Sequence, residues 1–271
     1  MTIFEAAVLG IVQGVTEFLP ISSTAHLRVV PALVGWPDPG ASFTAVLQLG
    51  TLAAVLAFFA SDLAAMARGT LGAIVDANRR HDPQARLLGY LVVGTLPVVI
   101  AGVLFKNAIR GELRALSVIA AAQIVVGLAL AVVERLARHK RGFDEIAWRD
   151  VLIIGCAQAL ALVPGVSRSG ITILAAMAIG LRRDGAARFS FLLSIPAVAG
   201  AGIFEMKHVL HSDVGATALG VGLVTSAVVG YASIAWLLRF LRTRTTIPFV
   251  IYRIALGTAI FVLLGAGLLG P

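Results

Sequence analysis

The stretch Gln13–His26 reads Gln-Gly-Val-Thr-Glu-Phe-Leu-Pro-Ile-Ser-Ser-Thr-Ala-His, near the start of a chain of 271 residues. It begins in an apolar run, is interrupted at Pro20, and resumes on three consecutive hydroxyl residues. Proline removes a helical hydrogen bond and ends a helix, whereas serine and threonine cap the start of the next one. The stretch therefore predicts two half-length helices, 3–19 and 22–34, that meet at a polar tip.

A second stretch, Gln158–Thr172, has the same build: Gln-Ala-Leu-Ala-Leu-Val-Pro-Gly-Val-Ser-Arg-Ser-Gly-Ile-Thr. It predicts half-helices at 151–163 and 168–181 on either side of a Pro-Gly break. Both stretches show the same features in the same order, which indicates an internal repeat. The matched residues are Gly10 with Gly155, Gln13 with Gln158, Pro20 with Pro164, and Ser22 and Ser23 with Ser167 and Ser169.

The composition is that of an integral membrane protein. Hydrophobic residues make up 59% of the chain and charged residues 13%, and the mean hydropathy is +0.95. A soluble domain is about half apolar and about a quarter charged. About 20 apolar residues cross a bilayer as a helix. We expect six such spans, at 42–60, 87–105, 115–134, 189–206, 216–238 and 247–269.

The net charge of +8 comes largely from short segments between the apolar runs. Loops rich in Lys and Arg stay on the cytoplasmic side of a membrane. We therefore interpret the charge as an orientation signal and expect no nucleic-acid partner. The segments placed in the cytoplasm are 61–86, 135–149, 182–188 and 239–244.

We expect an all-α integral membrane protein with an inverted-topology repeat. With the basic segments in the cytoplasm, the six spans cross the membrane in alternating directions. The first broken pair must then enter from outside and the second from the cytoplasm. Each half, about 1–137 and about 150–271, is then a re-entrant helix hairpin plus three transmembrane helices within a single membrane domain, 1–271. Broken helices of inverted repeats meet near the midplane of known transporters. We therefore expect the two tips to form one site.

The first tip offers an intramembrane carboxylate. Gln13 and Glu17 are four residues apart and share a helix face. An ionisable side chain in hydrocarbon is costly and is by default a functional hypothesis. Glu17 can act as a ligand of a hard cation, for which oxygen donors favour Mg²⁺ or Ca²⁺, or as a general base. The alternative is a structural ion pair with Arg168.

The hydroxyl residues that follow supply a candidate nucleophile. Ser22, Ser23 and Thr24 can cap the restarting helix, but one cap needs only one of them. His26 lies on the next turn. Beside a serine and a carboxylate, a histidine can serve as the acid/base partner of a hydroxyl nucleophile. The alternative is a hydrogen-bonded packing role.

The second tip has the composition of an anion site. Ser167 and Ser169 offer hydroxyls, and the restarting helix offers free N–H groups and its positive dipole end. Arg168 adds a planar donor fork suited to phosphate oxygens, and Thr172 lies on the same face. The alternative is a Ser/Gly-rich turn with an arginine that reaches the membrane surface.

These motifs resemble those of the bacterial undecaprenyl-diphosphate phosphatase family, of the bacitracin-resistance type. The resemblance rests on Gln13-x-x-x-Glu17, on Phe-Leu-Pro-Ile-Ser-Ser-Thr-x-His26 and on Pro-Gly-x-Ser-Arg-Ser-Gly, and it covers essentially the whole chain. It implies hydrolysis of undecaprenyl diphosphate to undecaprenyl phosphate and inorganic phosphate, which recycles the lipid carrier for cell-wall synthesis. It also implies a divalent cation and a site in the bacterial cytoplasmic membrane that opens to the periplasm.

The resulting assignment divides the polar residues among three roles. The metal ligands are Glu17 and Gln13, with Mg²⁺ or Ca²⁺ as the ion. The family allows Glu or Gln at the first of these positions, so Glu17 alone supplies a carboxylate here. The catalytic residues are Ser23, His26, Glu17 and Arg168. The residues that hold phosphate are Ser22, Ser167, Arg168, Ser169 and Thr172.

Several alternatives stay open at this point. His26 or water can replace Ser23 as the nucleophile. A transporter or flippase for a lipid phosphate or another anion would use the same inverted plan without a covalent step. The expected partners are a polyprenyl diphosphate substrate and membrane lipids, and a homodimer is left open.

Overall fold

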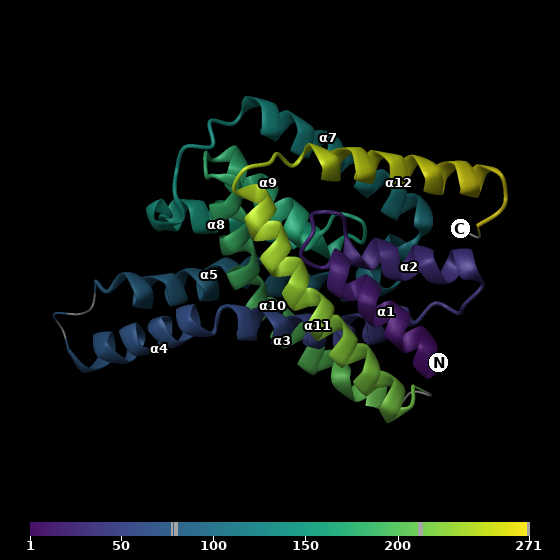
Figure 1. The fold of residues 1–271 in the computed structure, drawn as a ribbon, viewed down its shortest axis with the longest axis horizontal. Helices are drawn as coiled ribbons and strands as arrows, with labels where there is room; N and C mark the ends of the chain where they lie inside the picture. The colour runs from purple at the N-terminus through teal and green to yellow at the C-terminus, as the bar shows by residue number, and fades with distance from the viewer. Residues whose placement is uncertain (77, 79–80, 211–213, 270–271) are drawn as a thin grey trace.

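The computed structural model describes residues 1–76, 78, 81–210 and 214–269, and the described chain is built of helices and their connections (Figure 1). Within these residues, six helices are long and apolar enough to cross a membrane, as expected for a multi-pass membrane protein. They agree with the six predicted spans, although α10 begins six residues earlier than predicted. These helices are α3 (Gly40–Phe58), α5 (Pro83–Leu104), α7 (Leu116–Leu136), α10 (Arg183–Leu210), α11 (Ala216–Leu241) and α12 (Ile247–Gly265).

Two pairs of shorter helices form the predicted hairpins. They have 14, 12, 12 and 11 residues, so at about 1.5 Å per residue each falls short of a bilayer core of about 30 Å. Each pair is interrupted where the sequence predicts it, at the segments containing Pro20 and Pro164. The pairs are α1 (Ile3–Thr16) with α2 (Ser23–Val34), and α8 (Trp148–Ala159) with α9 (Arg168–Ala178), the latter joined through a 3₁₀ turn at Leu160–Leu162.

The segment 61–86 differs from the prediction. It was expected to be a polar loop, but it contains the helix α4 (Ala60–Val75), which lies alongside α5 and stands away from the rest of the molecule (Figure 1). The cause is an apolar stripe at helical spacing, with Leu63 and Met66 packed inward. Residues 77, 79 and 80 of this segment lie outside the described residues. Shorter helical turns occur at Lys106–Arg110, Glu112–Arg114 and Phe143–Glu145.

The two hairpins pack against spans from the other half of the chain. α1 packs along α11, and α8 packs along α5. Glycine permits both contacts, because a Cβ on Gly10 would lie 1.9 Å from the Thr225 hydroxyl oxygen and a Cβ on Gly155 would lie 2.5 Å from the Gly94 carbonyl oxygen. These are the glycines of the repeated Gly-x-x-Gln motif, so the motif reflects close helix packing.

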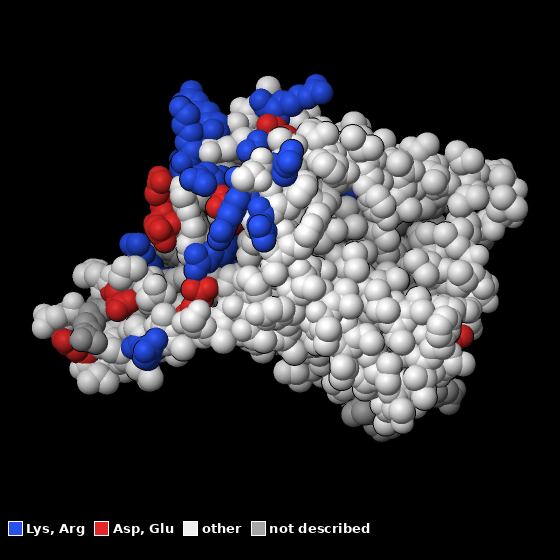
Figure 2. All heavy atoms as spheres, viewed as in Figure 1, with Lys and Arg blue, Asp and Glu red and all other residues white. Residues whose placement is uncertain are grey.

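Charged side chains gather on one side of the molecule, around the end of α11 and the start of α12 and over the projecting α4 and α5, whereas the remaining visible surface is largely uncharged (Figure 2). The basic connections 137–147, 179–182 and 242–246 contribute to this end. Exposed apolar side chains such as Val103 and Ile251 cover the long helices elsewhere, at 68% and 63% exposure. This distribution is typical of helices that face lipid with one charged end at the membrane surface.

Candidate active site

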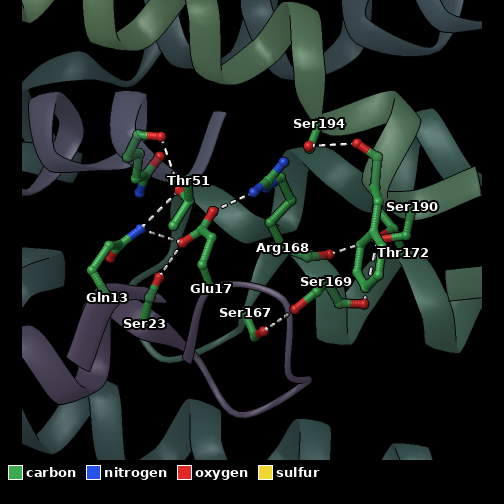
Figure 3. A network of polar contacts seen from close by, with 12 residues as sticks. Gln13, Glu17, Ser23, Thr51, Ser167, Arg168, Ser169, Thr172, Ser190 and Ser194 are labelled. Carbon is green, nitrogen blue, oxygen red and sulfur yellow. Dashed lines mark hydrogen bonds and ion pairs between the residues drawn. The ribbon is translucent and has the colours of Figure 1, made fainter. Parts of the chain in front are cut away.

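The two hairpin tips meet at an ion pair. The carboxylate of Glu17, just after α1, pairs with the guanidinium of Arg168, the first residue of α9, although the two are 151 positions apart in the chain (Figure 3). Their side chains are 4% and 16% exposed. A carboxylate and a guanidinium therefore lie together in a largely dehydrated place, as the sequence analysis expected of a shared site.

Both tips use the same unusual cap. Ser22 and Ser167 precede α2 and α9 with φ values of 74° and 73°, in the left-handed region that favours glycine. The Ser22 hydroxyl oxygen accepts the Ala25 N–H at 3.4 Å, and the Ser167 hydroxyl oxygen accepts the Gly170 N–H at 3.1 Å. These turns direct the first residues of α2 and α9 into the shared site.

Arg253 in the middle of α12 joins the two tips. Its side chain is fully buried, and its guanidinium donates to the carbonyls of Pro20 at 3.0 Å, Gly165 at 2.8 Å and Val166 at 3.1 Å. Further donations reach carbonyls of α7. The sequence analysis did not single out Arg253. An arginine inside an apolar run was the signal that could have identified it.

The carboxylate of Glu17 contacts the candidate nucleophile. Its Oε2 atom accepts hydrogen bonds from the Ser23 hydroxyl at 2.6 Å and from the Gln13 amide at 2.9 Å. The same amide nitrogen lies 3.5 Å from the hydroxyl of Thr51 on α3, a residue that the sequence analysis missed. The Ser23 hydroxyl thus already donates to a group that can take its proton.

The remaining hydroxyls of the second tip divide into two groups. Ser167 faces the cavity described below. Ser169 lies 3.1 Å from the Ser167 hydroxyl and donates to the Leu19 carbonyl at 3.0 Å. Thr172 donates to the Arg168 carbonyl at 2.7 Å, and its oxygen lies 2.6 Å from that of Ser190. The structure therefore places Ser169 and Thr172 in contacts that tie α9 to its neighbours, behind Arg168.

A cavity of about 240 Å³ opens beside the ion pair. Its polar wall comes from both tips, and apolar residues of α3, α5 and α10 complete it. Two polar atoms of lining residues, Nη1 of Arg168 and Oε1 of Gln158, are buried without a hydrogen-bond partner among the described residues. So is Oε1 of Gln13, which does not line the cavity but whose amide nitrogen contacts Glu17. A buried donor or acceptor without a partner is costly, so these atoms favour a polar ligand. The tips contribute Glu17, Ser22, Ser23, Thr24, Ser167 and Arg168 to the polar wall, and the other polar lining residues are Thr44, Gln48, Arg114 and Gln158.

His26 lies outside this network. Its Nδ1 atom is 2.7 Å from the Ser22 carbonyl oxygen, its Nε2 atom is 2.6 Å from the Tyr252 hydroxyl, and its ring stacks on that of Tyr252. It does not line the cavity. The structure therefore brings Ser23, Glu17 and Arg168 together but leaves His26 outside the cavity lining, next to Tyr252, which was not predicted from the sequence.

The oxygen atoms near Glu17 are compatible with a hard divalent cation. The described residues contain no group of three or more His, Cys, Asp or Glu side chains that could hold a metal ion. Mg²⁺, however, binds in many enzymes through one or two carboxylates together with substrate phosphates. Glu17 and the unpartnered Oε1 of Gln13 fit that smaller requirement. Such an ion would take its other ligands from substrate and water.

Comparisons with known proteins give matches along nearly the whole chain. A sequence model of the family described as "Bacitracin resistance protein BacA" matches residues 6–259. An undecaprenyl-diphosphatase of Myxococcus xanthus is 52% identical over all of this chain and 92% of its own length. That of Chlorobium limicola is 46% identical over 99% of both chains, and that of Gloeobacter violaceus is 50% identical over 98% and 93%. The match spans nearly the whole sequence, and the chain therefore belongs to the bacitracin resistance protein BacA family.

Proposed function

We propose that this protein is an undecaprenyl-diphosphatase of the bacterial cytoplasmic membrane, which hydrolyses undecaprenyl diphosphate to undecaprenyl phosphate and inorganic phosphate. The full-length relatives that carry this name support the proposal. The observation that carries it is the buried contact of Ser23, Glu17 and Arg168 at the side of a cavity. A nucleophile, a proton acceptor and an anion binder are thereby held in one place.

Arg168 is the proposed phosphate ligand. One side of its guanidinium pairs with Glu17, and its buried Nη1 atom has no partner among the described residues. The planar fork of arginine matches phosphate oxygens, and the N-terminus of α9 adds a positive dipole. Phosphate oxygens of the substrate would compete with Glu17 for the guanidinium. Ser22 and Ser167 line the same wall, whereas Ser169 and Thr172 hold α9 in place.

Ser23 is the proposed nucleophile. Its hydroxyl oxygen attacks the terminal phosphorus while Glu17 accepts the hydroxyl proton, and undecaprenyl phosphate leaves as the bond to the bridging oxygen breaks. Glu17 then gives this proton to the departing phosphate oxygen. Water attacks the phosphorus of the phosphoserine while Glu17 accepts a proton from it, the bond between phosphorus and the Ser23 oxygen breaks, and Glu17 returns the proton to Ser23 as inorganic phosphate is released. His26 is the second candidate for moving the proton, but its ring must first leave Tyr252. Direct attack by water that donates its proton to Glu17 is the other route.

A divalent cation, Mg²⁺ or Ca²⁺, fits beside Glu17 and Gln13 in this scheme. When bound there, it supplies charge neutralisation for the diphosphate. The chain's own residues still orient the substrate and move the proton. Because only Glu17 is a carboxylate, we expect the cation to bind weakly until a substrate supplies further oxygen ligands.

We infer that the halves, about 1–137 and 150–271, are inverted repeats and that the cavity opens to the periplasm. The matched left-handed serine caps support the repeat. So does the packing, because the first helix of each hairpin lies against the second span of the other half, α1 on α11 and α8 on α5.

Ile109 and Arg114, which line the cavity, belong to the connection between α5 and α7. The positive-inside rule, applied to the other basic loops, puts this connection outside.

Phosphate release in detergent tests the function. The purified chain has no second compartment there, so a transporter or flippase for the lipid phosphate would release nothing. We expect wild type to release phosphate from a polyprenyl diphosphate, and Ser23→Ala to be slower by at least about 100-fold because it lacks the nucleophile. His26→Ala should retain more activity than Ser23→Ala.

Three outcomes would revise the proposal. Absence of phosphate release by wild type would favour the transporter. Wild-type turnover by Ser23→Ala would leave water as the nucleophile. A greater loss in His26→Ala than in Ser23→Ala would move the covalent step or the proton transfer to the histidine.

A further inference from the structure

A second cavity, of about 280 Å³, lies at the charged end of the molecule. Three arginines line it: Arg182 before α10, Arg188 within α10 and Arg242 at the end of α11. We call this the arginine pocket. The Glu17–Arg168 site does not contribute to its walls, because the two cavities share no lining residue.

The arginine pocket is not neutralised by the protein. Asp184 is the one acidic residue of its lining, and it lies 3.4 Å from Nε of Arg182. Arg188 donates to Asp62 of α4 at 2.7 Å. Arg242 has no ion-pair partner in the part of the chain that the structure describes. Three guanidinium groups therefore face two carboxylates, and one positive charge remains in the pocket.

Arg188 is fixed in position and has a hydrogen-bond donor without a partner among the described residues. Its guanidinium carbon lies over the ring of Phe143, 4.6 Å from the ring centroid, so its position is fixed from one side by stacking. Its Nε atom is buried and has no hydrogen-bond partner among the described residues. An immobilised arginine with an unused donor, next to a second arginine that has no partner, favours an oxyanion ligand.

The surroundings of the pocket suit a lipid rather than a free solute. Leu238 of α11 forms part of the wall, and Trp236 lies less than one turn earlier on the same helix, 50% exposed and stacked on Phe240. Exposed tryptophans mark the level of the lipid headgroups. The blue side chains in Figure 2 gather around the same end of α11, where the helix changes from an apolar to a basic surface.

We propose that the arginine pocket binds the phosphate group of an anionic phospholipid in the cytoplasmic leaflet. Arg182 and Arg242 contact the phosphate oxygens, Nε of Arg188 donates to one of them, and the acyl chains lie along the apolar surface of α11. Basic pockets at helix ends on the cytoplasmic side are suited to such headgroups. This site is independent of the proposed phosphatase activity, because no residue of the reaction belongs to it.

Lipid binding by the purified full-length chain tests this proposal. Native mass spectrometry would measure retention of phosphatidylglycerol against phosphatidylcholine for wild type and for Arg182→Gln/Arg242→Gln. The matched control is Arg239→Gln/Arg244→Gln, which removes the same charge from the same helix end without touching the lining. The pocket variant loses two direct charge-assisted contacts to the phosphate, so phosphatidylglycerol binding should weaken at least about 30-fold. The control arginines do not line the pocket, and salt screens their attraction, so the control should remain within about threefold of wild type.

The alternatives give different results. Equal losses in the pocket variant and the control would mean diffuse charge attraction, and equal retention of both lipids by wild type would mean that no site exists; either result overturns the proposal. If millimolar inorganic phosphate displaced phosphatidylglycerol as effectively as added phosphatidylglycerol does, the pocket would be reassigned to free phosphate. A size-exclusion profile like that of wild type confirms that each variant is folded.

Discussion

Arg168 and Glu17 neutralise each other's charge in a largely buried place. The pair is buried, and the Glu17 carboxylate also accepts hydrogen bonds from Ser23 and Gln13 of its own tip. Breaking a buried pair by removing one partner leaves an uncompensated charge, which costs about 3–5 kcal/mol. The residues proposed to bind and transform the substrate therefore also hold the two hairpin tips together.

Replacing Arg168 separates its geometry from its charge. Arg168→Lys keeps a positive charge but loses the planar fork that can bind Glu17 and a phosphate together. We expect kcat/KM for a polyprenyl diphosphate to fall at least about 100-fold, which corresponds to about 2.7 kcal/mol of transition-state stabilisation. Arg149→Lys, at an exposed arginine, is the control and should leave kcat/KM unchanged. An Arg168→Lys variant within about threefold of wild type would refute the bidentate role.

Gln13→Glu tests the metal assignment. The Gln13 amide now donates to Glu17, so a glutamate there places two carboxylates within hydrogen-bonding distance of each other. Without a cation they repel, whereas a bound divalent ion is held by both. We therefore expect lower activity than wild type at micromolar Mg²⁺ or Ca²⁺ and recovery at millimolar concentrations. A titration of phosphate release against cation concentration measures this, with Gln84→Glu on the surface as the control. Unchanged cation dependence would contradict the assignment.

Individual site residues differed in how far sequence could identify them. Glu17, Ser23 and Arg168 are polar residues at helix breaks in an apolar chain. Placing polar or charged side chains there costs free energy, which indicates a functional role. Thr51 and Tyr252 are ordinary residues of long helices, and only the packing of α3 and α12 brings them to Gln13 and His26. Their roles depend on how each helix is rotated about its own axis, which the local sequence does not predict.

At the scale of elements, the hairpin tips are positioned by a third helix. Arg253 of α12 binds backbone carbonyls of both tips and of α7, so it links the tips in addition to the Glu17–Arg168 pair. Backbone carbonyls in a break have no helical partner. A five-donor guanidinium can satisfy several of them at once.

Arg253→Leu should therefore destabilise the protein and disrupt the site. Leaving these buried carbonyls without a donor costs about 1–3 kcal/mol each, so we expect a lower midpoint of thermal unfolding in detergent and little phosphate release. Arg253→Lys should unfold at a temperature between those of wild type and Arg253→Leu. Its kcat should fall by a larger factor than its KM rises, because the tips shift while the cavity remains. Arg239→Leu, at the exposed end of α11, is the control. An Arg253→Leu variant with wild-type unfolding would show that the tips hold themselves.

Helix boundaries followed from proline and serine, whereas α4 did not follow from its charges. The breaks at Pro20 and Pro164 were predictable because proline cannot continue a helix. The arginines of 61–86, Arg68 and Arg86 among them, predict a polar loop there, although Met66 of α4 is 1% exposed. A short amphipathic helix next to a long apolar one is difficult to separate from a loop by hydropathy alone.

At the scale of the whole molecule, hydropathy predicted the spans but not their arrangement. Six apolar runs were visible because lipid demands length and low charge. Which helices meet depends on surface shape, as in the contacts of α1 with α11 and of α8 with α5. Gly10 and Gly155 are the local traces of those contacts, since a side chain there would collide with the neighbouring helix.

The orientation of the molecule can be measured with single cysteines. Cys156 is the one cysteine of the chain, so Cys156→Ser provides a background without reactive thiols. A membrane-impermeant thiol reagent should label Pro37→Cys in right-side-out vesicles and should label Asp144→Cys only after the vesicles are opened, because the basic loops remain inside. Both parent positions are exposed. Labelling of both variants from the same side would contradict the proposed topology.

The left-handed serines at the two tips have a consequence for heat tolerance. Ser22 and Ser167 adopt a backbone conformation that costs a residue other than glycine about 1–3 kcal/mol, while glycine caps a helix only a few tenths less well than serine. Ser22→Gly and Ser167→Gly should therefore unfold at higher temperature, yet turn over more slowly because a hydroxyl is missing from the cavity wall. Calorimetry and phosphate release on the same samples would show whether the two quantities move in opposite directions. A screen that selected for thermostability alone would then enrich glycine at both positions and yield variants with low phosphatase activity.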